Sequence, residues 1–255
     1  MKPFEIYDAL IDCLPENVRV KTYINGKIWT MSELDDGSLG LAMTFDCAAR
    51  APLHGADYDG MELRDLAALS KSWNFPEAAI GMSAINAWYN ERARALAAGV
   101  VFPDAERGVQ DAFSIYLERA RGKKVATIGS FEKAFRVYRP VCELSVLERA
   151  PSAGEYPDTA CEYILPEQDL VFITGSAFVN KTMPRLLELS SGADTILLGP
   201  TVPLAPVLFE FGIDCLAGFV VTEPEVCRRL AACGYEISPT PAGKRVRMSR
   251  EEVIK

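Results

Sequence analysis

The chain has 255 residues, of which 49% are hydrophobic and 24% are charged, a composition typical of a globular protein that can bury a substantial core. Its 35 acidic residues outnumber 27 lysines and arginines, so the formal net charge of −8 argues against general binding to a nucleic-acid backbone. The start lacks the apolar segment of a secretory signal and no apolar stretch approaches a membrane span, so we expect a cytoplasmic protein without nucleic-acid or membrane partners.

The first 120 residues predict a small α+β domain. β-prone residues in 17–34 flank Asn25-Gly26, a dipeptide typical of two-residue hairpin turns, and 38–45 could add a third strand. Residues 59–70 and 74–96 are predicted helices, the second with Pro76 in its first turn. Residues 102–124 are expected to supply a connecting helix.

Residues 121–255 show a repeating pattern of a short apolar run, a break and a helical stretch. Near-continuous apolarity is typical of strands covered on both faces, and the spacing of roughly 20 to 27 residues suits a helical crossover. We therefore expect an α/β domain with a mostly parallel, five-stranded sheet and helices on both sides. The predicted strands lie in 123–129, 143–149, 169–175, 195–200 and 215–221, and a capping box at 222–225 predicts a further helix start.

Polar residues follow several of these predicted strands at the point where each ends. Parallel strands end at one edge, and ligands of open α/β sheets bind beyond that edge, where the strand order reverses. The candidates for ligand binding are therefore Gly129, Ser130, Thr174, Gly175, Ser176, Gly199, Pro200 and Thr201, with Glu148 as a proton acceptor.

The segment 174–182 is the richest in polar groups. Backbone N–H groups at the next helix start, together with Ser176 and Lys181, could hold a carboxylate or a phosphate. In the alternative interpretation these residues bind no ligand. Thr182 caps a helix, Asn180 forms a turn and Lys181 is exposed to solvent. The prolines that follow in 199–206 either start a helix or stiffen one side of a pocket.

Gly129 and Glu148 also permit a nucleotide hypothesis. Glu148 follows Gly129 by 19 residues. In dinucleotide-binding folds, the acidic residue that hydrogen-bonds the ribose hydroxyl has a similar offset from the glycine-rich turn. The full G-x-G-x-x-G fingerprint is missing, so this pair is a weak signal.

The predicted helix at 74–96 carries Glu77 and Gly81 on one face. Glu77 is a candidate general base or metal ligand, or else it complements the helix dipole. Gly81 suggests close packing against another backbone. Trp73, or Phe131 in the second domain, could stack on a ligand.

Seven cysteines without a C-x-x-C pair, and one histidine, predict neither a disulfide framework nor a zinc site. Cys227 and Cys233 are six residues apart, an offset that does not place them on one helix face, so we interpret them as small apolar residues. His54 is expected in a solvent-exposed loop.

Segments 71–90, 169–190 and 195–221, in this order and spacing, resemble the DUF364 family, labelled a heavy-metal chelation domain, with its N-terminal companion DUF4213. The resemblance implies an N-terminal domain (1–120) similar to the enolase N-terminal fold, a Rossmann-like domain (121–255) and a site in the cleft between them. It extends to Glu77, Gly81, Asn86, Gly129, Thr174, Gly175, Asn180, Thr182, Gly199 and Pro200.

Three functional hypotheses follow. The first is an enzyme or binding protein for a small, anionic or metal-chelating metabolite held between the domains, with any metal ion carried by that small molecule. The second is a non-catalytic carrier or sensor of a metal or metallophore. The third, suggested by Glu148, is a nucleotide- or S-adenosylmethionine-dependent transferase. Acidic proteins of this size are often homodimers.

Overall fold

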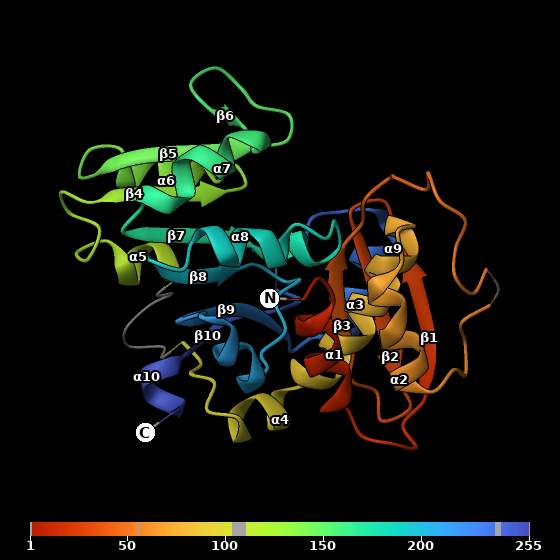
Figure 1. The fold of residues 1–255 in the computed structure, drawn as a ribbon. Coiled ribbons are helices and arrows are strands. Elements are labelled where there is room, and N and C mark those ends of the chain that lie inside the picture. The colour runs from red at the N-terminus through yellow and green to blue at the C-terminus, as the bar shows by residue number, and fades with distance from the viewer. Residues whose placement is uncertain (1, 56, 104–110, 238–240, 255) are drawn as a thin grey trace.

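The computed structural model describes residues 2–55, 57–103, 111–237 and 241–254. It combines a small antiparallel sheet with a large, mostly parallel one, as the predicted α/β class requires. Figure 1 shows the small sheet and its helices on the right and the large sheet on the left, with the carboxyl ends of the parallel strands turned toward the N-terminal part. None of the described helices is long and apolar enough to cross a membrane.

The small sheet is an antiparallel meander. It follows α1 (Glu5–Asp12), which the sequence did not predict, and contains β1 (Val20–Asn25), β2 (Trp29–Leu34) and β3 (Leu39–Met43) in that order. Asn25 still pairs with Thr30, and the Gly26 amide donates to the carbonyl oxygen of Trp29 at 3.2 Å. The turn therefore lies at Lys27-Ile28, two residues beyond the expected Asn25-Gly26.

One face of this sheet packs on α3 (Phe75–Tyr89), which follows α2 (Leu63–Ala68) and the 3-10 turn η1 (Leu69–Lys71). The predicted helix at 74–96 is interrupted at Asn90 and resumes as α4 (Arg92–Ala97). A β-carbon on Gly81 would lie within 3.0 Å of the backbone of η1, so the close packing expected there is confirmed. Asn74 caps α3 by accepting a hydrogen bond from the Glu77 amide.

The large sheet has seven strands rather than the predicted five, in the order β10-β9-β8-β7-β4-β5-β6. All five predicted runs form strands: β4 (Lys124–Ile128), β5 (Glu143–Glu148), β7 (Leu170–Thr174), β8 (Asp194–Leu198) and β9 (Cys215–Val221). The additions are β6 (Tyr156–Pro157), of two residues, and β10 (Gly243–Ser249), which pairs antiparallel with β9. Both lie at edges, where a strand needs little apolar sequence.

Helices and 3-10 turns connect these strands. They are α5 (Ala112–Tyr116), α6 (Glu132–Tyr138), η2 (Asp158–Ala160), α7 (Cys161–Ile164), η3 (Leu165–Glu167), η4 (Gly175–Phe178), α8 (Met183–Leu189), η5 (Pro206–Phe211), α9 (Pro224–Cys233) and α10 (Arg250–Val253). The expected connecting helix is seen as α5, and part of its predicted range, 104–110, is outside the described residues. The capping box predicted at 222–225 is wrong, because α9 has no side-chain cap hydrogen bond.

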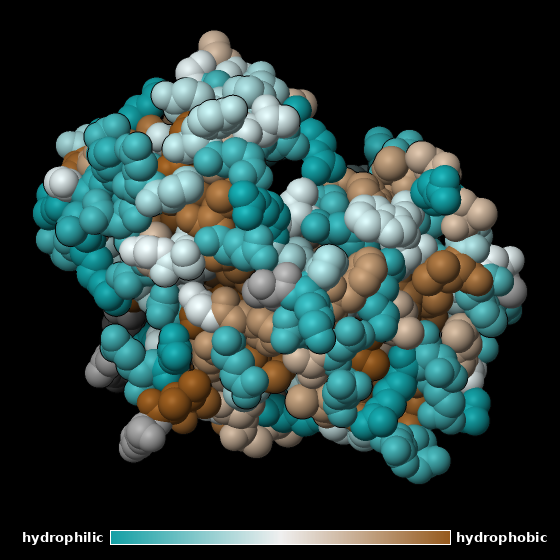
Figure 2. Space-filling view, in the orientation of Figure 1, coloured by the Kyte–Doolittle hydropathy of each residue, from teal (hydrophilic) through white to brown (hydrophobic). Residues whose placement is uncertain are grey.

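The two parts of the chain share their packing. Helix α9 covers the second face of the small sheet, where Cys227 and Ala231 pack with Trp29, Met31 and Leu41, so β2 is buried along its whole length. A second buried cluster includes residues of both parts, among them α1, α3 and η4. Figure 2 shows a mostly hydrophilic surface, hollowed between the upper left lobe and the lobe on the right.

Candidate functional site

A cavity of about 410 Å³ lies at the carboxyl edge of the large sheet. β4 pairs with β5 on one side and with β7 on the other, so the strand order reverses at β4, the position where open α/β sheets bind ligands. The small sheet contributes Trp29 of β2 and Met43 of β3. The remaining lining residues are Asp111, Ala112, Phe113, Ser130, Phe131, Glu132, Lys133, Thr174, Ser176, Leu198, Gly199, Pro200, Thr201, Ala217, Gly218, Phe219, Glu236, Arg245, Val246 and Arg247.

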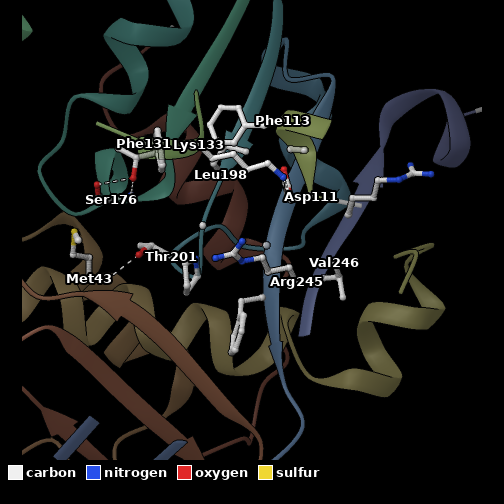
Figure 3. Close-up of a pocket in the computed structure, with 18 of the residues that line it drawn as sticks. Met43, Asp111, Phe113, Phe131, Lys133, Ser176, Leu198, Thr201, Arg245 and Val246 are labelled. Atoms are coloured by element: carbon white, nitrogen blue, oxygen red, sulfur yellow. Dashed lines mark hydrogen bonds and ion pairs between the residues drawn. The ribbon is translucent and has the colours of Figure 1, made fainter. Parts of the chain in front are cut away.

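The structure brings part of the predicted ligand-binding set together in this cavity. These residues come from the turns after β4, β7 and β8, which are far apart in the sequence. They are Ser130, Phe131, Thr174, Ser176, Gly199, Pro200 and Thr201. Figure 3 shows Phe131, Ser176 and Thr201 on the walls of the cavity, with a hydrogen bond joining Thr201 to Met43 of β3.

Three other predicted residues shape these turns without lining the cavity. Gly129 leaves β4 with φ of 105°, a conformation that suits glycine. A β-carbon on Gly175 would lie within 3.0 Å of Val202 and the carbonyl carbon of Thr201, so this glycine lets two turns approach each other. Asn86 donates from Nδ2 to the carbonyl oxygens of Leu41 (2.7 Å) and Thr201 (3.0 Å) and so attaches α3 to the turn after β8.

Glu77 and Trp73 are placed elsewhere. The carboxylate of Glu77 accepts hydrogen bonds from the amides of Leu53 (2.6 Å) and His54 (2.9 Å) and from the Tyr58 hydroxyl (3.2 Å). Burial raises the pKa of Glu77, but the hydrogen bonds it accepts outweigh burial and lower that pKa overall. Glu77 is thus a buried anchor for the segment around His54, and the exposed Trp73 contacts Phe4 edge to face.

Glu148 also uses its carboxylate locally. Its oxygens accept from the amides of Ser130 (3.0 Å) and Arg149 (2.7 Å), which ties the end of β5 to the turn after β4. Glu148 does not line the cavity, although Ser130 beside it does.

The predicted residues before α8 form a compact turn. Oδ1 of Asn180 accepts from the amide (3.1 Å) and from the hydroxyl (2.7 Å) of Thr182, so Asn180 has the turn-forming contact of the alternative interpretation. Thr182 makes no side-chain cap hydrogen bond. Lys181, which that alternative placed in solvent, is largely buried; none of the three lines the cavity.

Sequence reasoning missed the charged residues of the cavity. Figure 3 shows the guanidinium of Arg245 pointing toward Thr201, with Lys133 and Asp111 on the opposite wall. Lys133 forms an ion pair with Asp111. Arg245 is exposed at the cavity mouth and belongs to β10, a strand that the sequence did not predict. The alternating pattern of 243–249 was the available signal for this strand and its inward-facing arginine.

Two further charged lining residues, Arg247 and Glu236, make side-chain hydrogen bonds. Arg247 donates to Ser249 (2.9 Å) and Glu252 (2.7 Å), and Glu236 accepts from the Trp29 indole (3.0 Å). Phe113 and Phe131 form an aromatic wall with ring centroids 5.4 Å apart. The cavity thus combines cations, hydroxyls and aromatic surface.

The donor atoms do not suit a resident heavy metal. Soft metals favour thiolates and imidazoles, yet the lining residues include neither cysteine nor histidine. Within the part of the chain that the structure describes, no group of three or more His, Cys, Asp or Glu side chains could hold a metal ion. Asp111 is moreover already paired with Lys133.

The fold and this geometry define a mixed α/β protein with a cavity at the carboxyl edge of a mostly parallel sheet. The chain belongs to the DUF364 family: the DUF364 model, described as "Putative heavy-metal chelation", matches residues 111–247, and the DUF4213 model, with the same description, matches residues 7–89.

Relatives of this chain are uncharacterised. It is 31% identical over 191 residues to an uncharacterised protein of Methanocaldococcus jannaschii, covering 71% of this chain and 69% of the relative. A DUF364 protein of unknown function from Desulfitobacterium hafniense has a similar solved structure, with 39% identity, a TM-score of 0.87, and coverage of 97% and 98% of the two chains. A second DUF364 protein of unknown function, from Pyrococcus horikoshii, has a solved structure with the same fold, at 24% identity and a TM-score of 0.76. The match covers 98% of this chain and 100% of the Pyrococcus chain.

Proposed function

We propose that this protein binds a small anionic metabolite in the cavity between the large sheet and the N-terminal part. The observation that carries the proposal is the placement of Arg245 and several hydroxyl groups around a cavity where the strand order reverses. A guanidinium can bind a carboxylate or phosphate through two parallel hydrogen bonds.

The hydroxyls of the cavity are arranged to complete such a site. Thr201 accepts from the Met43 amide at 2.9 Å, so its hydroxyl proton can be donated to a ligand. The hydroxyls of Thr174 and Ser176 are 3.0 Å apart, and one of their two protons is enough for the bond between them. The aromatic wall of Phe113 and Phe131 would contact the apolar part of the molecule.

A role in heavy-metal chelation then requires the metabolite to carry the metal. Because the lining residues lack soft donors, the metal would be cargo already coordinated by the small molecule, whose carboxylates would contact Arg245. The same cavity serves an enzyme that acts on such a complex and a non-catalytic carrier or sensor of it.

The strand order supports a more specific fold and a second candidate ligand. The order β6-β5-β4-β7-β8-β9 corresponds to 3-2-1-4-5-6, the strand order of the Rossmann fold, so we propose a Rossmann-like sheet. Because Rossmann folds bind dinucleotides, a nucleotide or S-adenosylmethionine is the alternative ligand. The antiparallel meander followed by helices supports the enolase-like comparison for the N-terminal part. We propose that the protein acts in the cytoplasm, and a homodimer is compatible with this site.

Native mass spectrometry of freshly purified protein tests the proposal. The wild type should retain a small molecule, with or without a metal ion, and Arg245→Ala should lose it because the main anion-binding group is gone. Lys244→Ala is the matched control, since it removes the same charge from an exposed neighbour on β10 that does not line the cavity. A wild type that carries no small molecule, or an Arg245→Ala protein that retains as much, contradicts the proposal.

A further inference from the structure

The aromatic wall of the cavity is the end of a larger cluster of rings. Ring centroids are 5.4 Å apart for Phe131 and Phe113, 4.8 Å for Phe113 and Phe172, and 5.4 Å for Phe172 and Tyr138. Phe113, Phe172 and Tyr138 are buried, whereas Phe131 is half-buried and lines the cavity. Because aromatic rings pair at centroid distances of about 4.5–7 Å, a ligand ring in the cavity would continue the cluster at Phe131.

The backbone around Phe131 holds its ring in position. Gly129 leaves space for the ring, since a β-carbon on this glycine would lie 3.1 Å from Cε2 of Phe131. The carbonyl oxygen of Phe131 accepts from the amides of Ala134 (2.9 Å) and Phe135 (3.3 Å), which attaches the residue to the start of α6. A ring fixed in this way loses little freedom when a ligand contacts it.

The far side of the cavity has groups that suit a ring with an anionic substituent. Figure 3 shows Phe113 and Phe131 on one side, with Met43, Thr201 and Arg245 across from them. A methionine sulfur makes favourable contacts with aromatic rings. A ring between the two sides would thus contact aromatic surface and a thioether, while its anionic group meets the guanidinium of Arg245.

We propose that the molecule bound in this cavity is an aromatic carboxylate, whose ring contacts Phe113 and Phe131 and whose carboxylate contacts Arg245. This inference rests on the proposed function, because it presupposes the anion site, and it adds that the apolar part of the ligand is a ring. The cavity volume of about 410 Å³ suits a small molecule of this kind.

Isothermal titration calorimetry of the intact chain with phenylpropanoate and cyclohexylpropanoate tests the inference. The two probes share the carboxylate and the linker and differ in the ring. A wall that only excludes water would favour the cyclohexyl probe, which is the more apolar of the two. We expect the phenyl probe to bind roughly two- to tenfold more tightly, the gain typical of an aromatic pair. Equal binding, tighter binding of the cyclohexyl probe, or binding of neither overturns the inference.

Two variants assign this preference to the wall. In Phe131→Leu, which replaces the ring by an aliphatic side chain, the ratio of the two dissociation constants should fall to about one. Phe135→Leu is the matched control, because Phe135 is also half-buried on α6 but does not line the cavity, and it should keep the wild-type ratio. The ratio compares two probes on one protein, so a partly unfolded fraction does not change it. A ratio that Phe131→Leu leaves unchanged overturns the inference.

Arg245→Ala separates a failure of the ring contact from a failure of the anion site. It should weaken both probes by the same factor. If it does so while the wild type binds the two probes equally, the ring contact fails and the anion site stands. If it weakens neither probe while the phenyl preference remains, the anion site fails and the ring contact stands.

Adenosine monophosphate is the third probe, because it joins an aromatic ring to a phosphate. Weaker binding of this nucleotide than of phenylpropanoate supports the carboxylate. Tighter binding of the nucleotide overturns the carboxylate and assigns the ring contact to a nucleobase.

Discussion

The cavity and the segment between η4 and α8 each contain a lysine, but the two ammonium groups have different partners. Lys133 in the cavity lies against Asp111, whereas Lys181 in that segment has two rings and a carbonyl oxygen and no carboxylate among the described residues. A carboxylate partner stabilises an ammonium, and burial without one destabilises it. The difference teaches that the available counterion and water, more than the type of residue, decide how strongly a lysine holds its proton.

The largest expected effect comes from removing a side chain that joins the two parts. Asn90 donates to the carbonyl oxygens of Val202 (3.0 Å) and Phe219 (3.3 Å) and accepts from the Leu204 amide (2.9 Å), and it is buried. Asn90→Ala leaves three backbone groups without these partners, so we expect a loss of about 3 kcal/mol in the free energy of unfolding, measured with urea.

Arg92→Ala, on the exposed side nearby, is the control for Asn90→Ala and should cost less than about 1 kcal/mol. Equal effects of the two substitutions would mean that the amide bridge contributes little. The two parts of the chain would then be held together mainly by apolar packing and by the remaining hydrogen bonds to Thr201.

A second prediction concerns pH and Lys181. The lowered pKa of Lys181, about 7, means that the folded protein binds fewer protons at this amine than the unfolded chain does between pH 7 and about 10.5. Stability must therefore rise with pH in that window. Relative to Lys181→Met, the wild type should gain about 2 kcal/mol between pH 7 and pH 9 in urea titrations.

The matched control for this pH dependence is Lys133→Met, in the cavity, which removes a lysine paired with a carboxylate. It should not abolish the rise seen in the wild type. If wild type and Lys181→Met respond to pH in parallel, the ammonium of Lys181 is not destabilised by its surroundings.

The smallest effect separates backbone strain from side-chain contacts. At position 181, with φ of 68°, glycine should be more stable than alanine by about 1 kcal/mol, because only glycine adopts this conformation without cost. At position 133, inside α6, the order should reverse by about 0.5–1 kcal/mol, since glycine disfavours helix. Thermal unfolding of the four variants measures both differences, and the same order at both positions would remove the argument from strain.

Much of the fold follows from local patterns in the sequence. The five predicted strands are confirmed because strands covered on both faces need continuous apolar runs, a signal that no neighbour has to supply. The antiparallel edge strand β10 was missed because its basic, alternating sequence resembles that of an exposed segment. Its neighbour β9 provides the pairing that makes it a strand.

The site was predictable only in part. The turns after β4, β7 and β8 could be located in advance, because parallel strands end at one edge, and residues of all three line the cavity. The sequence also placed Glu77 and Glu148 among the site residues, but the carboxylate oxygens of both accept hydrogen bonds from backbone amides. Most of these amides lie 18 or more residues away in the sequence, so only the folded structure shows them as partners.

The sequence by itself determined the α/β class, five strands of the large sheet and the edge at which its polar turns gather, because apolar periodicity and turn chemistry act over a few residues. Only the tertiary structure decided that α9 covers the small sheet, that Arg245 faces Lys133 and Asp111 across one cavity, and that Lys181 is partly buried against aromatic rings. Those outcomes depend on desolvation and on partners more than a hundred residues away, and local sequence carries neither.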